Sequence, residues 1–366
     1  MLRGVAQLAR VRDSGSRGRR FESAHPDQKD MPELVQKIES AALPKSYNEL
    51  LIEFNNKNKQ EGLPKGELLE FTIEDDAISV YNPAPIVIEG QTYLWARVEE
   101  RATEKDSAVR LFKEGGTGEW EIVEEAPTFK RLQDPFYCGM INGYYILGGV
   151  RIYDVAGSPY LGYGTVFYRY RNSFTELVNQ NGEICAPFAV GPKKMKGIRM
   201  IQTTNGRIGV TTRPQGQFGG RGRIGYFEIE SLDTLENALA DYNRQKDQKT
   251  LNGGLFVDEE WGGTNELFNL PDGKIGVLGH IAGFGKDSTK KNYYPITFIF
   301  DPQTKSVSNV QINATAEQFP PVAVKKGDLG SICYSGGLVK LGNGDSWLYA
   351  GLGDSKVARI IIKNPF

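Results

Sequence analysis

The segment INGYYILGGVR, residues 141–151, decides the fold, because its turn glycine Gly143 is followed by a run of mostly apolar residues. An Asn-Gly pair supplies the positive φ angles of a tight hairpin turn, and the seven residues after it predict a β-strand. Four other segments repeat the pattern: IEGQTYLWAR, TNGRIGVTTR, PDGKIGVLGH and GNGDSWLYAG, with turn glycines Gly90, Gly206, Gly273 and Gly344. Their spacing of 53 to 71 residues suits a four-stranded unit with its loops. The sequence therefore predicts an all-β fold, a five-bladed β-propeller.

The composition agrees with many short strands and excludes several classes of function. The chain of 366 residues has 43 glycines and 18 prolines, and its 44 basic and 45 acidic residues are interspersed. With a formal net charge of −1, we expect neither nucleic acid nor an anionic membrane as a partner. Because no apolar stretch approaches the roughly 18 residues of a membrane span, no membrane segment is predicted. The three cysteines are far apart, which argues against a disulfide framework or a zinc site and favours a cytoplasmic location.

The domain organisation follows from patterns outside the repeat. Residues 1–30 show no strand alternation and predict a disordered or mis-annotated leader, with a basic targeting arm as the alternative. Residues 31–65 contain the amphipathic stretches LVQKIESAAL and NELLIEF and predict an N-terminal helical segment, and residues 66–366 form the predicted propeller domain. Asp233 and Glu236 make a capping-box pattern that predicts one inserted helix, whose apolar stripe suits local packing or a subunit contact.

Cationic residues recur at one position of the repeat. The residues seven positions after the turn glycine include Arg97, Arg213 and His280, and the fifth repeat has Gly351 there with Asp354 just beyond. Since corresponding strands of successive blades converge on the central axis of a propeller, we expect these side chains to line one funnel. The alternative is that they are ion-paired residues of the framework.

The second repeat departs from this pattern. Its seventh residue is Val150, and Arg151 stands one position later. By strand parity Arg151 faces the other way, unless Gly148–Gly149 forms a bulge.

A carboxylate and an amide stand before prolines near the predicted funnel. Asp134 precedes Pro135 just upstream of the second repeat's strand, and Asn82 precedes Pro83 in the segment VYNPAP. A residue before proline is held extended, which fixes the direction of its side chain. The alternative for Asp134 is a simple Asp-Pro turn. An aspartate, an amide and several cations that converge predict a site for a sugar and a phosphate.

The cations indicate phosphorolysis rather than hydrolysis. Glycosidases that hydrolyse usually need two carboxylates, whereas a phosphorylase needs only the acid because phosphate is the nucleophile. Candidate ligands for the phosphate are Arg97, Lys193, Lys194, Arg213 and His280. The lysines could instead belong to a solvated loop. The segment WGGTNELFNLPDG supplies Trp261, Asn265 and Glu266 as a sugar platform or as part of a connecting loop. The glycine-rich stretch 218–225 lacks the pattern of a nucleotide-binding loop.

At this point the chain resembles the mannosyltransferase/phosphorylases of glycosyltransferase family 108, once known only as a domain of unknown function, and the related β-mannoside phosphorylases of glycoside hydrolase family 130. The resemblance spans residues 70 to 366. The residues that carry it are Asn82-Pro83 with Arg97, Gln133-Asp134-Pro135, Lys193-Lys194, Thr212-Arg213-Pro214, Gly279-His280 and Gly351-Leu352-Gly353-Asp354.

The resemblance implies a five-bladed propeller in which Asp134 is the general acid, acting directly or through a sugar hydroxyl. It places phosphate on Arg97, Lys194, Arg213 and His280, and sugar hydroxyls on Asn82, Glu266 and Asp354. Family 130 usually has arginine after the Asp-Pro, where this chain has Phe136, so Arg151 is the candidate substitute. Inorganic phosphate would be a co-substrate, with no cofactor and no metal.

The expected function is a β-1,2-mannoside phosphorylase that releases α-mannose 1-phosphate with inversion. Its partners would be a mannose oligosaccharide with phosphate or mannose 1-phosphate, and some relatives in family 108 also use GDP-mannose for mannosyl transfer. Two alternatives stay open. One is an inverting hydrolase that draws on Asp76, Asp134 and Glu266, and the other is a carbohydrate-binding propeller without catalysis.

Overall fold

The computed structural model describes residues 44–73, 78–100, 103–216, 219–244, 251, 255–285, 290–329 and 331–366. The predicted leader, the LVQKIESAAL segment and Asp76 lie outside the described residues. Residues 43–366 form one compact unit. In the described part of the chain, no helix has the length and apolar character needed to cross a membrane.

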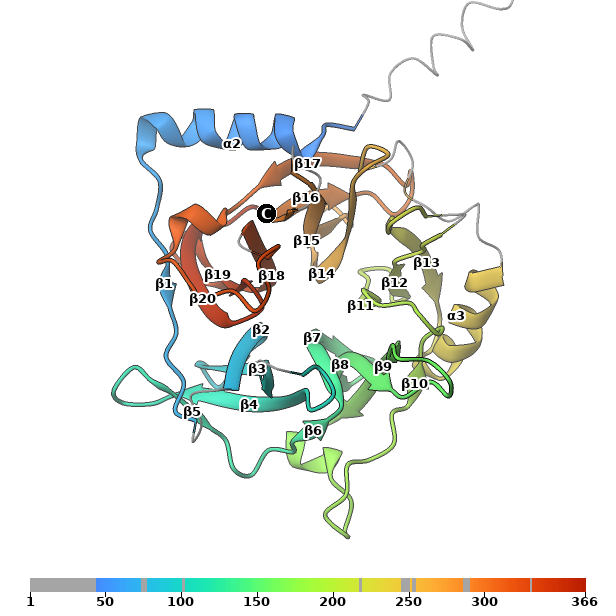
Figure 1. The fold of residues 1–366 in the computed structure, drawn as a ribbon. Coiled ribbons are helices and arrows are strands. Elements are labelled where there is room, and N and C mark those ends of the chain that lie inside the picture. Colours follow the sequence, from blue (N-terminus) through green and yellow to red (C-terminus); the bar gives the residue numbers. More distant parts are fainter. Residues whose placement is uncertain are drawn as a thin grey trace, which may run out of the picture. The chain divides into compact units, whose positions relative to one another are not determined.

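Antiparallel strands dominate this unit and form sheets around a common centre (Figure 1). One sheet has five strands: β2 (Ile78–Ile88), β3 (Gln91–Glu100), β4 (Ala108–Glu114), β5 (Trp120–Ile122) and β6 (Phe129–Lys130). The next has four: β7 (Leu132–Ile141), β8 (Tyr144–Tyr153), β9 (Gly162–Tyr170) and β10 (Ala189–Val190). A third has three: β11 (Arg199–Gln202), β12 (Ile208–Thr212) and β13 (Gly225–Ile229).

The remaining strands form one eight-stranded sheet with a parallel junction inside it. One half contains β14 (Trp261–Asn269), β15 (Ile275–Phe284), β16 (Lys291–Phe300) and β17 (Val307–Ile312). The other half contains β18 (Ser331–Lys340), β19 (Asp345–Leu352), β20 (Lys356–Lys363) and β1 (Glu67–Leu68), which pairs with β20. The halves meet where β16 and β18 pair in parallel over two residue pairs, Asn292↔Ser331 and Tyr293↔Ile332. The prediction of a mostly β fold is confirmed.

The five predicted hairpins are present in the structure. Each turn glycine has a positive φ angle: 82° at Gly90, 76° at Gly143, 83° at Gly206, 77° at Gly273 and 85° at Gly344. Each turn joins two antiparallel strands, and the second strand of each pair is the one predicted from the repeat. The first strands, β2, β7, β11, β14 and β18, lie nearest the centre (Figure 1).

The core lies between neighbouring sheets. Phe136, Ile146 and Phe167 from the β7–β10 sheet pack with Met200 and Val210 from the β11–β13 sheet. All five side chains are buried, and the remaining contacts between sheets repeat this arrangement. Burial of apolar surface between the sheets therefore holds their inner strands in place.

Helix α2 (Tyr47–Glu61) packs on the outside of the β14–β17 strands. It begins at a capping box in which Ser46 accepts a hydrogen bond from the Glu49 N–H and Glu49 accepts one from the Ser46 N–H. Leu50 and Phe54 bury their side chains in the same cluster as Ile281 and Ile312.

Helix α3 (Leu235–Arg244) is the predicted inserted helix, but its start differs from the prediction. A short 3-10 turn precedes it, and the Ser231 side chain accepts the hydrogen bond from the Asp233 N–H. Asp233 forms an ion pair with Arg169, and Glu236 accepts a hydrogen bond from the Val190 N–H. The predicted Asp233–Glu236 capping box is wrong because these side chains tie the helix to the neighbouring sheet.

The buried face of α2 yields a stability prediction. Leu50→Ala should lower the free energy of unfolding by about 2–4 kcal/mol, because Leu50 is only 1% exposed and its truncation leaves a cavity. Ile52→Ala on the same helix is the control, because Ile52 is 60% exposed and its loss should change stability by less than about 0.5 kcal/mol. Urea denaturation measures both, and equal losses would contradict the packing of α2.

Candidate active site

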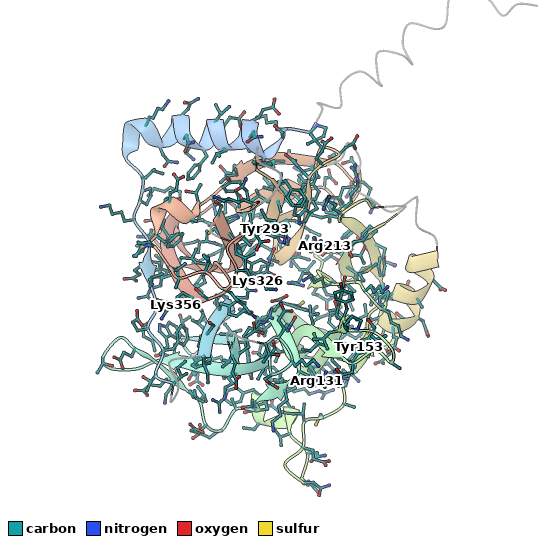
Figure 2. All side chains as sticks on the ribbon, viewed as in Figure 1. Arg131, Tyr153, Arg213, Tyr293, Lys326 and Lys356 are labelled. Carbon is teal, nitrogen blue, oxygen red and sulfur yellow. The ribbon has the colours of Figure 1, made fainter. Side chains whose placement is uncertain are left out.

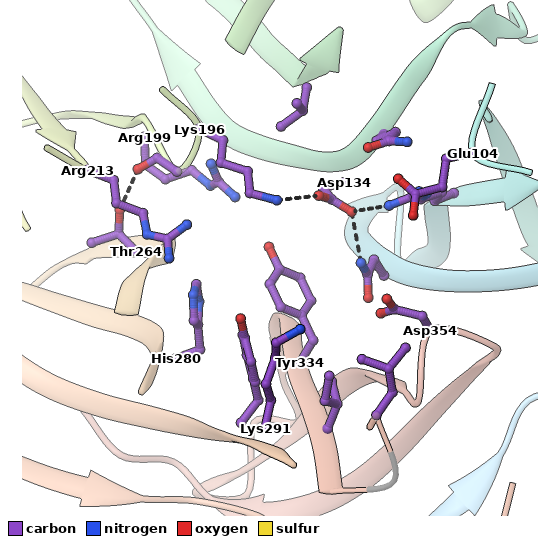
Figure 3. A pocket seen from close by; sticks show the side chains of 18 residues that line it. Glu104, Asp134, Lys196, Arg199, Arg213, Thr264, His280, Lys291, Tyr334 and Asp354 are labelled. Carbon is purple, nitrogen blue, oxygen red and sulfur yellow. Dashed lines mark hydrogen bonds and ion pairs between the residues drawn. The ribbon is translucent and has the colours of Figure 1, made fainter. Parts of the chain in front are cut away.

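A cavity of about 260 Å³ opens at the centre, where the first strands of the sheets converge (Figure 3). Its lining is mostly polar and comes from strands far apart in the sequence. The polar residues include Asn82, Arg97, Asp134, Lys196, Arg199, Arg213, Thr264, His280, Lys291 and Asp354. Figure 2 shows Arg213 and Tyr293, another residue of the lining, near the centre of the unit.

Bulges on the first strands turn two polar side chains into the cavity. On β2 the pairing moves from Tyr81↔Arg97 to Ala84↔Trp95, so that Asn82 and Pro83 together stand opposite one residue, Ala96. On β7 it moves from Gln133↔Val150 to Phe136↔Gly148, so that Asp134 and Pro135 stand opposite one residue in the same way.

The bulges correct the expectation that the residues before proline are extended. Asn82 has φ 49° and Asp134 has φ 45°, both in the left-handed region. This conformation is uncommon for a residue with a side chain, although Asn and Asp tolerate it best. The bulge, rather than an extended backbone, fixes the direction of the Asp134 carboxylate.

Asp134 is bound on three sides. Its Oδ1 atom accepts hydrogen bonds from Asn82 Nδ2 at 2.8 Å and from Arg97 Nη1 at 3.1 Å. Lys196 Nζ lies 3.8 Å from Oδ2. Burial acts to raise the pKa of Asp134, but the charges of Arg97 and Lys196 and the hydrogen bonds lower it to about 2. The carboxyl group is therefore ionised at neutral pH in the protein without ligand.

The repeat position predicted to line the funnel does so. Arg97, Val150, Arg213 and His280 all border the cavity. Gly351 takes the fifth place, and a side chain there would overlap the Asn82 side chain. Strand β8 pairs with β9 without interruption, so Arg151 faces away from the cavity and donates a hydrogen bond to the Tyr168 hydroxyl at 2.8 Å.

The opposite side of the cavity carries arginines without carboxylate partners (Figure 3). Arg213 Nε donates to the Gly262 carbonyl at 2.7 Å. Arg199 Nε donates to the Asn265 carbonyl at 2.8 Å, and its guanidinium stacks 3.8 Å from the Phe136 ring centre. Among the described residues neither arginine has a carboxylate within ion-pair distance. Two buried guanidinium groups that are not paired with a carboxylate make a site suited to an anion.

His280 completes this side of the cavity as a neutral ring. Its Nδ1 atom lies 2.8 Å from Asn265 Oδ1, and because an amide oxygen only accepts hydrogen bonds, Nδ1 carries the hydrogen. Burial, followed by the charges of Arg213 and Arg199, holds the pKa of His280 well below its usual value. The Nε2 atom is therefore a hydrogen-bond acceptor.

Asp354 and Glu104 give the cavity further carboxylates on the Asp134 side (Figure 3). Burial raises the pKa of Asp354, and the negative charge of Asp134 raises it further, against the lowering effects of Arg97 and Lys325. An acceptor of this kind suits the hydroxyl groups of a sugar.

Six of the described residues that the sequence offered as site candidates lie outside the cavity lining. They are Arg151, Lys193, Lys194, Trp261, Asn265 and Glu266. Lys194 is exposed and its φ of 64° belongs to a turn that directs Lys196, two residues later, to the cavity instead. A shift in the pairing of β14 around Asn265 carries Glu266 Oε2 to the Leu338 N–H at 2.8 Å. Removal from water raises the pKa of Glu266 to about 8.

Several lining residues were missed in the sequence. Lys196 and Arg199 lie just before the third repeat, Tyr334 lies on β18, before the fifth repeat, and Lys291 and Tyr293 lie on β16, which belongs to none of the five predicted hairpins. Arg199 carries one usable signal, since a charged residue in the apolar run IRMI indicates a buried functional group. Within the described part of the chain, no three His, Cys, Asp or Glu side chains gather as a metal site would require.

Fold and site together define the class of the protein: a β-sheet protein whose inner strands gather an ionised aspartate, further carboxylates and unpaired arginines in one central cavity. The chain belongs to the family described as "Protein of unknown function (DUF1861)", whose sequence model matches residues 55–366. None of the curated proteins matches the chain in sequence.

Solved structures extend this comparison. MPT-4, a mannose phosphorylase from Leishmania mexicana in complex with phosphate ion, is 29% identical over 86% of this chain and 93% of its own, with a TM-score of 0.72. MPT-1, a GDP-Man-dependent mannosyltransferase from the same organism, is 29% identical over 85% and 93%, with a TM-score of 0.71. A β-1,2-mannobiose phosphorylase from Listeria innocua is 12% identical over 80% and 92%, with a TM-score of 0.50, and shares the fold.

The contact between Gly351 and the β2 bulge gives a prediction about the site. In Gly351→Ala the added carbon would overlap Asn82 Oδ1 and come within 2.8 Å of the Asn82 nitrogen. We expect a loss of about 1–3 kcal/mol in unfolding free energy and a displaced Asn82. Gly116→Ala is the control, because its added carbon meets nothing within 4 Å. Denaturant melts and a crystal structure of the variant test this, and an unmoved Asn82 would refute the contact.

Proposed function

We propose that this protein is a β-1,2-mannoside phosphorylase that converts a β-mannoside and inorganic phosphate into α-mannose 1-phosphate with inversion. The observation that carries the proposal is the division of one cavity into an acid side with Asp134 and a cationic side with Arg199, Arg213 and His280. The similarity to a mannose phosphorylase and to a mannosyltransferase supports mannose as the sugar.

We also propose that the unit is a five-bladed propeller. The parallel junction between β16 and β18 divides the eight-stranded sheet into two antiparallel groups. With the three other sheets these would be the five blades, one for each turn glycine. The pairing of β1 with β20 would close the ring by joining the two ends of the domain.

The phosphate would lie on the cationic side. Arg199 and Arg213 would donate charge-assisted hydrogen bonds to its oxygens, and the His280 Nε2 atom would accept one from the P–OH group of the monohydrogen dianion. This set differs from the one predicted from the sequence. Arg199 takes the role that was predicted for Arg151 and Lys194, and Arg97 binds Asp134 rather than the phosphate.

The sugar would lie between the phosphate and Asp134. Asp354 would accept hydrogen bonds from sugar hydroxyls, and Asn82, which already binds Asp134, would border the same space. Glu266 is not part of this proposal because it points to the Leu338 N–H.

Asp134 would donate the proton to the glycosidic oxygen, directly or through a sugar hydroxyl. Because Asp134 is ionised in the protein without ligand, it must gain a proton in the complex. A bound phosphate dianion offsets the cations of the cavity and raises the pKa of Asp134 toward the neutral range. The anion is thus both the nucleophile and the group that makes the acid effective.

The proposed step balances in atoms and charge. A phosphate oxygen forms a bond to the anomeric carbon as the glycosidic C–O bond breaks, and the electron pair of that bond goes to the leaving oxygen. The leaving oxygen takes the Asp134 proton and departs as an alcohol. The hydrogen that the phosphate carried leaves the new phosphate monoester for solvent, and Asp134 stays ionised until the next phosphate dianion binds and it takes a proton from solvent. The reverse reaction uses ionised Asp134 as a base toward an acceptor hydroxyl.

GDP-mannose stays an alternative donor within this proposal. The similarity of the chain to a GDP-Man-dependent mannosyltransferase and to a mannose phosphorylase is nearly equal, so both donors have to be assayed. For the hydrolase alternative Glu266 is not available, because it lies outside the cavity lining, but Glu104 and Asp354 border the cavity with Asp134, so turnover without phosphate has to be assayed as well.

The first test incubates the protein with β-1,2-mannobiose, with and without phosphate, and measures mannose 1-phosphate. We expect phosphate-dependent release, and Asp134→Asn should lower kcat by about 10²–10⁴-fold because it cannot supply the proton. A fully active Asp134→Asn protein would refute the assignment of the acid. Free mannose without phosphate would indicate a hydrolase, and binding without turnover in both proteins would indicate a carbohydrate-binding protein.

A second test asks which of the predicted arginines, Arg213 or Arg151, binds the phosphate. Arg213→Met should raise the KM for phosphate at least about tenfold, because it removes one charge-assisted hydrogen bond to the anion. Arg151→Met is the matched control, since Arg151 donates to Tyr168 outside the cavity lining and its loss should leave the KM for phosphate unchanged. Steady-state kinetics at varied phosphate give both values, and the reverse pattern would place the anion elsewhere.

A further inference from the structure

Glu99 is a buried carboxylate that does not border the cavity, yet it is bound to the group that holds Asp134. It is 2% exposed and lies on β3, two residues after Arg97. Arg97 donates to Glu99 Oε2 through Nε at 3.0 Å and through Nη2 at 2.7 Å. These bonds occupy one edge of the guanidinium, so Nη1 is the nitrogen left to reach Asp134 at 3.1 Å.

Groups from three other segments hold Glu99 in turn. The Tyr81 hydroxyl on β2 donates to Oε1, as does the Lys325 ammonium from the loop before β18, and the Ser107 hydroxyl donates to Oε2. Ser107 also accepts a hydrogen bond at 3.0 Å from Gln133, the neighbour of Asp134. Glu99 is therefore connected to Asp134 by two routes, one through Arg97 and one through the β7 backbone.

We propose that Glu99 is a positioning residue: it orients Arg97 so that one N–H reaches Asp134, and its negative charge limits how firmly Arg97 keeps Asp134 ionised. The inference about turnover rests on the proposed function, because the ionisation of Asp134 affects the rate only if Asp134 is the proton donor. Without Glu99, the guanidinium would be free to turn its paired nitrogens toward Asp134 and to hold it as a permanent carboxylate.

The charges around Asp134 determine whether its pKa rises or falls when Glu99 or Lys325 is replaced. The charged and titratable groups that act on Asp134 or are acted on by it are Arg97, Lys196, Arg199, Arg213, His280, Tyr334 and Asp354. Arg97 is the nearest cation to Asp134 and the one that Glu99 directly neutralises. Loss of the negative charge at Glu99 must therefore lower the pKa of Asp134, whereas loss of the positive charge at Lys325 must raise it or leave it unchanged.

The test compares Glu99→Gln with Lys325→Met, since both variants remove one charge from the same buried cluster. We expect Glu99→Gln to move the alkaline limb of the phosphorolysis pH profile about one unit lower, which is a tenfold loss of rate on that limb. Lys325→Met should move it upward or not at all. If both residues were purely structural, both variants would change the pH profile in the same direction. Equal shifts of the alkaline limb in the two variants, or an unshifted limb in Glu99→Gln, would therefore overturn the proposal.

Two further measurements keep the result interpretable. Glu99→Asp retains the charge, so the alkaline limb of its pH profile should lie close to that of the wild type. Thermal melts show whether each variant is folded. If the wild type forms no mannose 1-phosphate, the proposed function fails by itself. A crystal structure of Glu99→Gln then decides the positioning role: we expect the Arg97 guanidinium to turn toward Asp134, and an Arg97 in its original position would overturn the inference.

Discussion

The bulge that places Asp134 against Arg97 is the constraint on which the site depends. A residue before proline in the left-handed region costs about 1–3 kcal/mol, and it persists only where its surroundings determine it. Here the hydrogen bonds from Asn82 and Arg97 to the Asp134 carboxylate offset that cost. The β2 bulge at Asn82 has the same form, so two strained residues stabilise each other across neighbouring sheets. The close fit of Gly351 against Asn82 leaves little room for either to relax.

Charge is distributed unevenly in the cavity. On one side Arg97 is balanced by Glu99 and Asp134, and Lys325 also binds Glu99. On the other side Arg199 and Arg213 are buried and donate to backbone carbonyls, and no carboxylate of the described residues pairs with them. A buried cation without a counter-charge is expensive, and a bound anion removes most of that cost. The neutral His280 ring adds an acceptor without adding charge, which suits an anion that still carries a hydrogen.

The hairpins, and the position that faces the centre in each of them, could be predicted from the sequence. Both follow from a turn glycine and from the alternation of side chains along a strand, which are local properties. This alternation correctly places Arg97, Val150, Arg213 and His280 at the cavity and turns Arg151 away. It could not reveal the bulges, since their extra residues depend on the partner strand. For this reason the backbone at Asp134 and the direction of Glu266 were predicted wrongly. Lys196 and Arg199 were missed because the repeat was read only from the turn glycine onward, and both residues precede the turn at Gly206.

The order of the sheets supplies the geometry that an inverting displacement requires. Asn82, Arg97 and Asp134 come from the first two sheets in chain order, whereas Arg199, Arg213 and His280 come from the next strands, β11 to β15, and the segments that flank them. Strands that converge on one centre from different directions hold their side chains on opposite sides of the space between them (Figure 3). In the proposed reaction the acid must approach the leaving oxygen while the phosphate approaches the opposite face of the sugar. The bulged first strands therefore supply the acid side, and the repeated position seven residues after the turn glycine supplies Arg213 and His280 on the side proposed for phosphate.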